Sequence, residues 1–243
     1  MKVLAVIPAR LASTRLPRKM LREVAGERLV VRVYNAVRAC TLLDEVLVAT
    51  DSAEIAQICR ERGCNVQMTS SSHRSGTERV HEVSNLVPAD VYINVQGDEP
   101  LTRTEHLLAL IELMSDPKIE VGTLKTAGKA ADIGNPNVVK VVTDAAGKAL
   151  YFSRAAIPHD RDNTGADYFK HLGFYSYRKS ALDRFVALPE SSLELAEKLE
   201  QLRFLENGIP IHLRQTPFDT VGIDTEEDLL RAEEIIRQQA LAK

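Results

Sequence analysis

Short apolar runs alternate with helically spaced apolar residues along the first half of the chain. Runs rich in Val, Ile and Ala at Val3–Ile7, Glu45–Thr50 and Val91–Val95 have the length and β-branched content of buried strands. Between the first two, Leu29–Cys40 places its apolar residues three and four positions apart, as an amphipathic helix does. This alternation predicts right-handed βαβ units, and therefore a mostly parallel sheet with helices on both faces.

The rhythm changes after about Thr126, where hairpin-like strands and a broken helix replace the βαβ alternation. The chain then returns through a strand near Ile211–Arg214 to a closing helix that ends at Leu241. We therefore expect residues 1–121 plus 218–243 to form an α/β core, and residues 122–217 to form an inserted α+β lobe. No Pro/Gly/Ser-rich linker separates the two parts, which predicts one compact chain.

The balance of charged residues restricts the kinds of molecule that the protein can bind over its whole surface. Lys and Arg number 31 and Asp and Glu 34, so 31 − 34 gives a formal charge of −3, which argues against a general nucleic-acid or membrane-surface binder. Three cysteines without a metal-binding spacing predict reduced thiols. The N-terminal apolar run is too short for a signal peptide, and no run approaches the roughly 18 apolar residues of a membrane span. We expect a soluble, cytoplasmic protein.

A basic loop follows the first predicted strand, where ligands of open α/β sheets bind. It contains four cations within ten residues and two hydroxyls, namely Arg10, Arg15, Arg18 and Lys19 with Ser13 and Thr14. Guanidinium forks and an ammonium match the oxygens of a di- or triphosphate, whereas the plainer alternative is a solvated basic loop. Neither a GxxxxGK[ST] loop nor a GxGxxG motif occurs, which argues against P-loop and dinucleotide-binding folds.

Acidic residues follow two other predicted strand ends. Asp98 and Glu99 come after Val91–Val95, and Asp224 precedes the closing helix. Mg²⁺ prefers hard oxygen ligands and typically takes one or two carboxylates plus substrate phosphates, so Asp98 paired in space with Asp224 would suit it. The plainer alternatives are an acidic turn and an ordinary acid at a helix N-terminus.

Longer segments in a fixed order extend this pattern over nearly the whole chain. They are IPARLASTRLPRK from Ile7, VATD from Val48, SGTERV from Ser75, INVQGDEP from Ile93, NPNVVKVV from Asn135, ALYFSRAAIP from Ala149, KHLGFYSYR from Lys170, LEQLR from Leu199 and VGIDTEEDL from Val221. Together they resemble the nucleotide-sugar cytidylyltransferases, and most closely those that act on 3-deoxy-manno-octulosonate (Kdo). The resemblance implies a glycosyltransferase-A-like, Rossmann-like nucleotide-binding sheet, and a smaller lobe that binds the sugar acid and forms a homodimer.

The resemblance also implies a role for each matching residue. CTP phosphates would be held by Arg10, Ser13, Thr14, Arg15 and Lys19, and the cytosine and ribose by Asp51, Ser75, Gly76 and Gln96. One or two Mg²⁺ ions would bind Asp98 and Asp224, and Kdo would bind Arg154, His171, Tyr175, Glu200 and Gln201. Catalysis would depend on Arg10, Arg15, Lys19 and Asp98. The implied reaction joins CTP and Kdo to CMP-Kdo and diphosphate, which activates Kdo for lipopolysaccharide synthesis.

Three positions depart from the common pattern of that family. Arg18 stands where Gly is usual, Met20 where Pro is usual, and His159 where an aromatic residue is often found. The last lies near Arg154 in sequence, so 8-amino-Kdo is an alternative substrate. The same chemistry on an N-acylneuraminate is a separate alternative, over which the YFSRAAIP and HLGFYSYR segments favour Kdo. A non-catalytic scaffold is disfavoured because Lys19, Asp98 and Asp224 are all present. A nucleic-acid module is disfavoured because no aromatic residue interrupts the basic loop.

Overall fold

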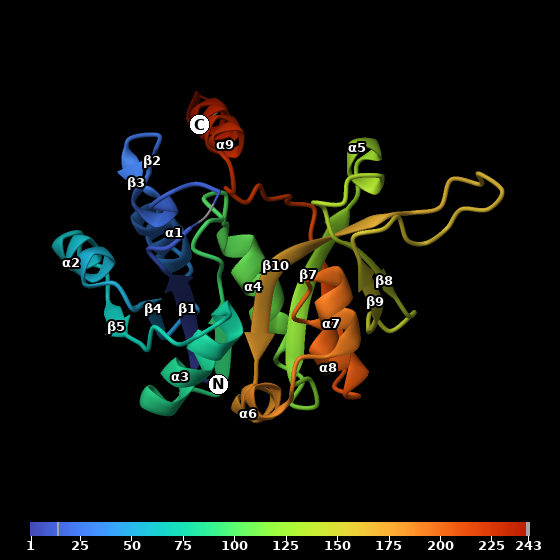
Figure 1. Ribbon diagram of the computed structural model, residues 1–243, viewed down its shortest axis with the longest axis horizontal. Coiled ribbons are helices and arrows are strands. Elements are labelled where there is room, and N and C mark those ends of the chain that lie inside the picture. The colour runs from blue at the N-terminus through green and yellow to red at the C-terminus, as the bar shows by residue number, and fades with distance from the viewer. Residues whose placement is uncertain (14, 242–243) are drawn as a thin grey trace. The chain divides into compact units, whose positions relative to one another are not determined.

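The computed structural model describes residues 1–13 and 15–241, with no side-chain description for the last two of these. The chain divides into two compact units (Figure 1). Unit 1 comprises Met1–Leu108 and Thr220–Lys243, and unit 2 comprises Ala109–Asp219. The insertion of one unit within the other resembles the predicted arrangement, with the division at residues 108 and 219 in place of 121 and 217.

A four-stranded parallel sheet organises unit 1, in the order β6-β1-β4-β5. Its strands are β1 (Val3–Ala9), β4 (Glu45–Thr50), β5 (Val66–Met68) and β6 (Val91–Asn94). Helices α1 (Leu29–Arg38), α2 (Ala53–Glu61) and α3 (Gly76–Leu86) pack against these strands. Shorter elements and the remaining helices are η1 (Lys19–Leu21), β2 (Glu23–Val24), β3 (Glu27–Arg28), α4 (Thr104–Leu113), which crosses the division between the units, and α9 (Glu226–Leu241). The predicted parallel sheet flanked by helices is confirmed.

Strand β1 continues two residues beyond its predicted end at Ile7. Pro8 pairs with Ala49 and Ala9 with Thr50, whereas pairing with β6 stops at Val6. A proline lacks the N–H of a ladder, and here it lies where only one neighbouring strand is paired. The extension carries the chain to the edge of the sheet before the basic loop begins.

Unit 2 is mixed, as an α+β lobe should be. Parallel β11 (Ile211–Gln215) and antiparallel β10 (Phe169–Tyr177) flank β7 (Val121–Ala127). A hairpin of β8 (Lys140–Thr143) and β9 (Ala149–Ser153) joins β10 through β8. The helices are α5 (Ala130–Ile133), α6 (Lys179–Ala187), α7 (Ser192–Glu197) and α8 (Leu202–Glu206), so the predicted broken helix is two short ones.

Candidate active site

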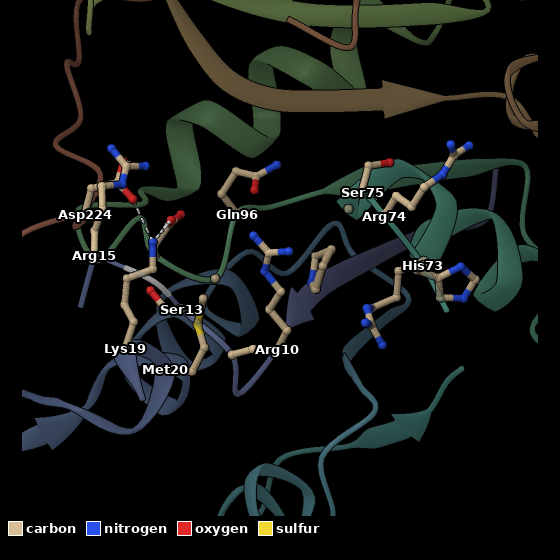
Figure 2. Close-up of a pocket in the computed structure, with 16 residues that line it drawn as sticks. Arg10, Ser13, Arg15, Lys19, Met20, His73, Arg74, Ser75, Gln96 and Asp224 are labelled. Carbon is tan, nitrogen blue, oxygen red and sulfur yellow. Dashed lines mark hydrogen bonds and ion pairs between the residues drawn. The ribbon is translucent and has the colours of Figure 1, made fainter. Parts of the chain in front are cut away.

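The segments that follow β1 and β6 form one pocket of about 200 Å³ (Figure 2). Because β1 and β6 are adjacent and parallel, their carboxyl ends lie at the same edge of the sheet. Nine of the residues predicted for CTP and metal line this pocket, namely Arg10, Ser13, Arg15, Lys19, Ser75, Gly76, Gln96, Asp98 and Asp224. Thr14 lies outside the described residues. The structure thus brings together segments that are far apart in sequence, such as those of Lys19 and Asp224, which are 205 positions apart.

A close approach of backbone to backbone shapes the floor of the pocket at Gly97. A Cβ atom there would lie 2.8 Å from the carbonyl oxygen of Pro8 and 3.1 Å from Sδ of Met20. Any larger residue would therefore push the acidic segment away from the end of β1. Met20, one of the departures from the family pattern, is buried against this glycine.

Lys19 joins the two acidic segments. Its Nζ donates to Oδ2 of Asp98 at 2.6 Å and to Oδ1 of Asp224 at 3.0 Å, and Arg15 contacts the other oxygen of Asp224 at 2.9 Å. Figure 2 shows the Lys19 and Asp224 side chains directed toward one another. Burial lowers the pKa of Lys19, but the two carboxylates outweigh burial and raise the pKa overall. The ammonium therefore stays charged at neutral pH.

The backbone fixes this carboxylate pair. The N–H of Ile223 donates to the carbonyl oxygen of Asp98 at 2.9 Å, which ties the segment before α9 to the segment after β6. Asp228 accepts from the N–H of Asp224 at 3.1 Å and from the N–H of Thr225 at 2.9 Å. Thr225 and Asp228 form a capping box, because each side chain accepts from the backbone N–H of the other, and it orients Asp224 at the start of the helix.

These residues suit a hard divalent cation. Two carboxylates converge on one point, which Nζ of Lys19 contacts. Among residues 1–13 and 15–241, no group of three or more His, Cys, Asp and Glu side chains is arranged to hold a metal ion. A pair of carboxylates completed by phosphate oxygens is the arrangement that Mg²⁺ commonly takes. Asp98 and Asp224 supply the two carboxylates of such an arrangement, with the Lys19 ammonium hydrogen-bonded to both of them in this structure.

The N-terminus of α3 forms another wall of the pocket. Ser75 caps the helix by accepting from the N–H of Glu78 at 3.3 Å, and Gly76 is the first helical residue. Unpaired N–H groups and the helix dipole favour an anion or a polar acceptor at this position. His73, Arg74 and Arg79 also line the pocket, although the sequence analysis did not single them out. The available signal was the SGTERV segment, which His73 and Arg74 directly precede and which contains Arg79.

Asp51 differs from the other predicted nucleotide ligands. It is not among the described residues that line the pocket, and its carboxylate lies 3.5 Å from the guanidinium of Arg79. Arg79 is 4% exposed and also donates to Oγ1 of Thr69 and to the carbonyl oxygen of Ser70. Burial lowers the pKa of Arg79, while Asp51 and Glu82 oppose that shift. Asp51 therefore does not line the pocket itself, but forms an ion pair with Arg79, which does.

Arg18 also lies outside the set of residues that line the pocket. It has a left-handed backbone with φ of 56°, and its guanidinium forms an ion pair with Glu54 of α2. Its side chain is 58% exposed. The extra cation at this departure from the family pattern therefore lies on the surface beside α2.

All five predicted sugar ligands lie in unit 2. His171 and Tyr175 are on β10, and Glu200 and Gln201 directly precede α8. Nε2 of His171 lies 3.1 Å from Oγ1 of Thr123, and the His171 ring lies 5.4 Å from the ring of Tyr175. Burial, with a smaller contribution from Lys170, lowers the pKa of His171 to about 3, so the imidazole is neutral. Burial also raises the pKa of Tyr175, and the nearby Glu200 adds to that shift. Gln201 is buried and directly precedes α8.

Arg154 is held by backbone carbonyls. Its Nε donates to the carbonyl oxygen of Glu197 at 2.8 Å, and its two terminal nitrogens contact the carbonyl oxygens of Pro136 and Lys198 at 3.0 and 3.5 Å. The backbone N–H of Arg154 donates to the Glu197 carboxylate at 2.9 Å. Three of the five N–H groups of the guanidinium are thus engaged, and the other two have no partner within residues 1–13 and 15–241.

Comparison with known proteins identifies the family. Residues 4–215 match the family described as Cytidylyltransferase. A 3-deoxy-manno-octulosonate cytidylyltransferase of Koribacter versatilis (strain Ellin345) is 62% identical, covering 98% of this chain and 91% of the relative. Its counterpart in Acidobacterium capsulatum is 51% identical, covering 98% of both chains.

The structural comparison agrees. A structure of CMP:2-keto-3-deoxy-manno-octonic acid synthetase complexed with CTP superposes with a TM-score of 0.95 at 41% identity, covering 98% of this chain and all of the other. This similarity confirms the predicted nucleotide-sugar transferase fold. The chain belongs to the cytidylyltransferase family, among the 3-deoxy-manno-octulosonate cytidylyltransferases, and is a nucleotidyltransferase.

Proposed function

We propose that the protein transfers CMP from CTP to Kdo and releases diphosphate, with Mg²⁺ bound to Asp98 and Asp224. The observation that supports this most directly is the convergence of Lys19 with both carboxylates in a pocket that also contains Arg10 and Arg15. Triphosphate, which carries several negative charges, needs such a concentration of donors before a nucleophile can approach it. The CTP-bound relative supports the same nucleotide.

The chain's own residues would position the reactants. In the reaction, the anomeric 2-hydroxyl of Kdo attacks the α-phosphorus and loses its proton to water, a new P–O bond forms, and the bond to the diphosphate leaving group breaks. Arg10, Arg15 and Lys19 would bind the phosphate oxygens and stabilise the charge that develops on the leaving group. When bound, Mg²⁺ would neutralise phosphate charge and lower the pKa of the attacking hydroxyl. Lys19 is already protonated, so it cannot act as the base that removes the proton of the attacking hydroxyl.

Unit 2 would bind the sugar acid. The two available N–H groups of Arg154 suit the carboxylate of Kdo. His171 is neutral and therefore suits a sugar hydroxyl better than a carboxylate. His159 is exposed, so its effect on the choice between Kdo and 8-amino-Kdo would require direct contact with the sugar.

We extend the proposal to the cellular role. The enzyme would act in the cytoplasm, activate Kdo for lipopolysaccharide synthesis and form a homodimer through unit 2. Leu150, Leu193 and Leu195 are exposed apolar residues of that unit that such an interface could cover. None of the helices in the described part of the chain has both the length and the apolar character needed to cross a bilayer.

The test is diphosphate release from CTP and Mg²⁺ with Kdo, 8-amino-Kdo and N-acetylneuraminate in separate reactions. We expect release with Kdo, its loss with EDTA and its recovery with excess Mg²⁺. Preference for 8-amino-Kdo would retain the chemistry and change the substrate. Full activity in EDTA would contradict the proposed metal, and no release with any sugar acid would contradict the proposed reaction.

A further inference from the structure

Asn94, the last residue of β6, buries an amide without a hydrogen-bond partner. The residue is 0% exposed, and neither its Oδ1 nor its Nδ2 has a partner within residues 1–13 and 15–241. Such groups are rare in folded proteins, because an unpaired amide loses its bonds to water and gains none in return. An unpaired buried group of this kind calls for a functional explanation when it lies next to a binding site.

The amide lies directly behind the wall of the nucleotide pocket. A Cβ atom on Gly76 would lie 3.5 Å from Nδ2 of Asn94 and 3.5 Å from Cγ of Pro8. Pro8 and Gly76 both line the pocket, whereas Asn94 does not. Asn94 therefore contacts the layer that a nucleotide would touch, and it can act on the nucleotide only through that layer.

This layer contains a complementary group. Gly76 is the first residue of α3, and the first N–H groups of an α-helix have no intrahelical partner. The carbonyl end of the Asn94 amide is an acceptor without a donor. Rotation of the amide by half a turn exchanges its oxygen and nitrogen ends, which are similar in size, so either end can face the helix. A small shift of the α3 N-terminus would pair donor and acceptor.

We propose that Asn94 is a positioning residue for nucleotide binding. A nucleotide in the pocket shifts the wall formed by Pro8 and Gly76 to a position where the start of α3 forms a hydrogen bond with the Asn94 amide. This inference rests on the proposed function only in that the pocket takes CTP. In the free protein the unpaired amide disfavours the folded state, and binding removes that disadvantage. The stability of the free protein and its affinity for CTP are therefore opposed at this one residue.

The test compares Asn94→Leu, which replaces the amide with an apolar side chain of similar size, with the wild-type protein. We expect a melting temperature of the free protein equal to or above that of wild type, and a CTP KM about tenfold higher, as for the loss of a hydrogen bond. We expect kcat and the KM of the sugar acid to change by less than about twofold. Asn94→Ala should show the same rise in CTP KM even if Leu is not accommodated.

Ser176→Ala is the matched control. Ser176 is also 0% exposed with an unpaired Oγ, but it lies on β10 in unit 2. This variant should leave the CTP KM within about twofold of wild type. An Asn94→Leu protein with an unchanged CTP KM, whatever its melting temperature, would overturn the inference. A wild-type protein that CTP does not stabilise would instead show that the proposed function has failed, and the inference with it.

Discussion

Nζ of Lys19 lies 2.6 Å from Oδ2 of Asp98, and the two side chains come from segments that follow different strands of the same parallel sheet. The Lys19 side chain is 10% exposed and that of Asp98 is 25% exposed. The pair therefore lies at the rim of the buried core, where charge interactions are stronger than on the open surface. A phosphate or a metal entering the pocket would meet both charges.

Replacement of Asp98 with Asn should reduce kcat by about 100- to 1,000-fold, the loss typical of a group that stabilises transition-state charge. The substitution keeps the size of the side chain and removes its charge, while Lys19 retains Asp224 as a partner. The melting temperature should consequently change little. Asp183→Asn removes a carboxylate from the Lys179 pair on α6 and should leave kcat unchanged. Near-normal turnover of the Asp98 variant would exclude Asp98 from the catalytic machinery.

Asp51 and Arg79 should be coupled in a double-mutant cycle. Arg79 is almost fully buried, so Asp51→Asn leaves a desolvated guanidinium with a weaker partner and should raise the CTP KM through Arg79. For Asp51→Asn and Arg79→Met we expect a coupling free energy of about 1–3 kcal/mol in urea unfolding. The exposed Lys179–Asp183 pair should give only about 0.3–0.5 kcal/mol. Additive effects at Asp51 and Arg79 would mean that the two residues act separately.

The contrast between Lys19 and Asp51 shows how far a sequence specifies this site. The Lys19 and Asp98 segments follow strands whose apolar runs are evident, and parallel strands deliver their carboxyl ends to one edge. Asp51 also follows such a strand, yet its side chain turns to Arg79. That choice depends on how β4, β5 and α3 pack, which no local pattern encodes.

Strand β7 shows the corresponding limit for the fold. Its sequence, VGTLKTA, contains Gly122, two threonines and Lys125, so apolar alternation does not distinguish it from a loop. Tertiary pairing supplies what the pattern lacks. Thr123 is fully buried and donates to the carbonyl oxygen of Phe174 at 2.7 Å, and β10 and β11 pair with either side of the strand.

His171 should make the protein less stable in acid. Burial holds its folded-state pKa at about 3, below the value of about 6.5 for an unfolded chain. As the pH falls from 6.5 toward 3, the unfolded state gains a proton that the folded state does not, so the free energy of unfolding decreases. His171→Gln should reduce this loss by up to about 1.4 kcal/mol per pH unit in urea titrations at pH 7.5 and 4.5. His159→Gln, which removes an exposed histidine, is the matched control for the substitution itself. Equal slopes in wild type and the His171 variant would show that His171 is protonated in the folded state.

Arg154 should determine the affinity for the sugar acid but not for CTP. Its contacts with carbonyl oxygens of Pro136, Glu197 and Lys198 fix the guanidinium and leave two of its five N–H groups for a carboxylate. Removing a charge-assisted, two-pronged contact costs roughly 1.5–3 kcal/mol, so Arg154→Met should raise the Kdo KM by about 10- to 100-fold. Arg154→Lys should restore only part of the affinity for Kdo, because an ammonium cannot reproduce the two-pronged contact of a guanidinium with a carboxylate.

The Arg154 variant needs a control for local unfolding, since the same guanidinium ties the backbone of residues 136 and 197 together. Arg161→Met removes an exposed arginine from the loop that precedes β10 and should leave both KM values unchanged. If Arg154 only braces the backbone, its replacement should lower the melting temperature without a selective rise in the Kdo KM. An increase confined to the Kdo KM, at an unchanged melting temperature, is expected only when the guanidinium itself binds the sugar carboxylate.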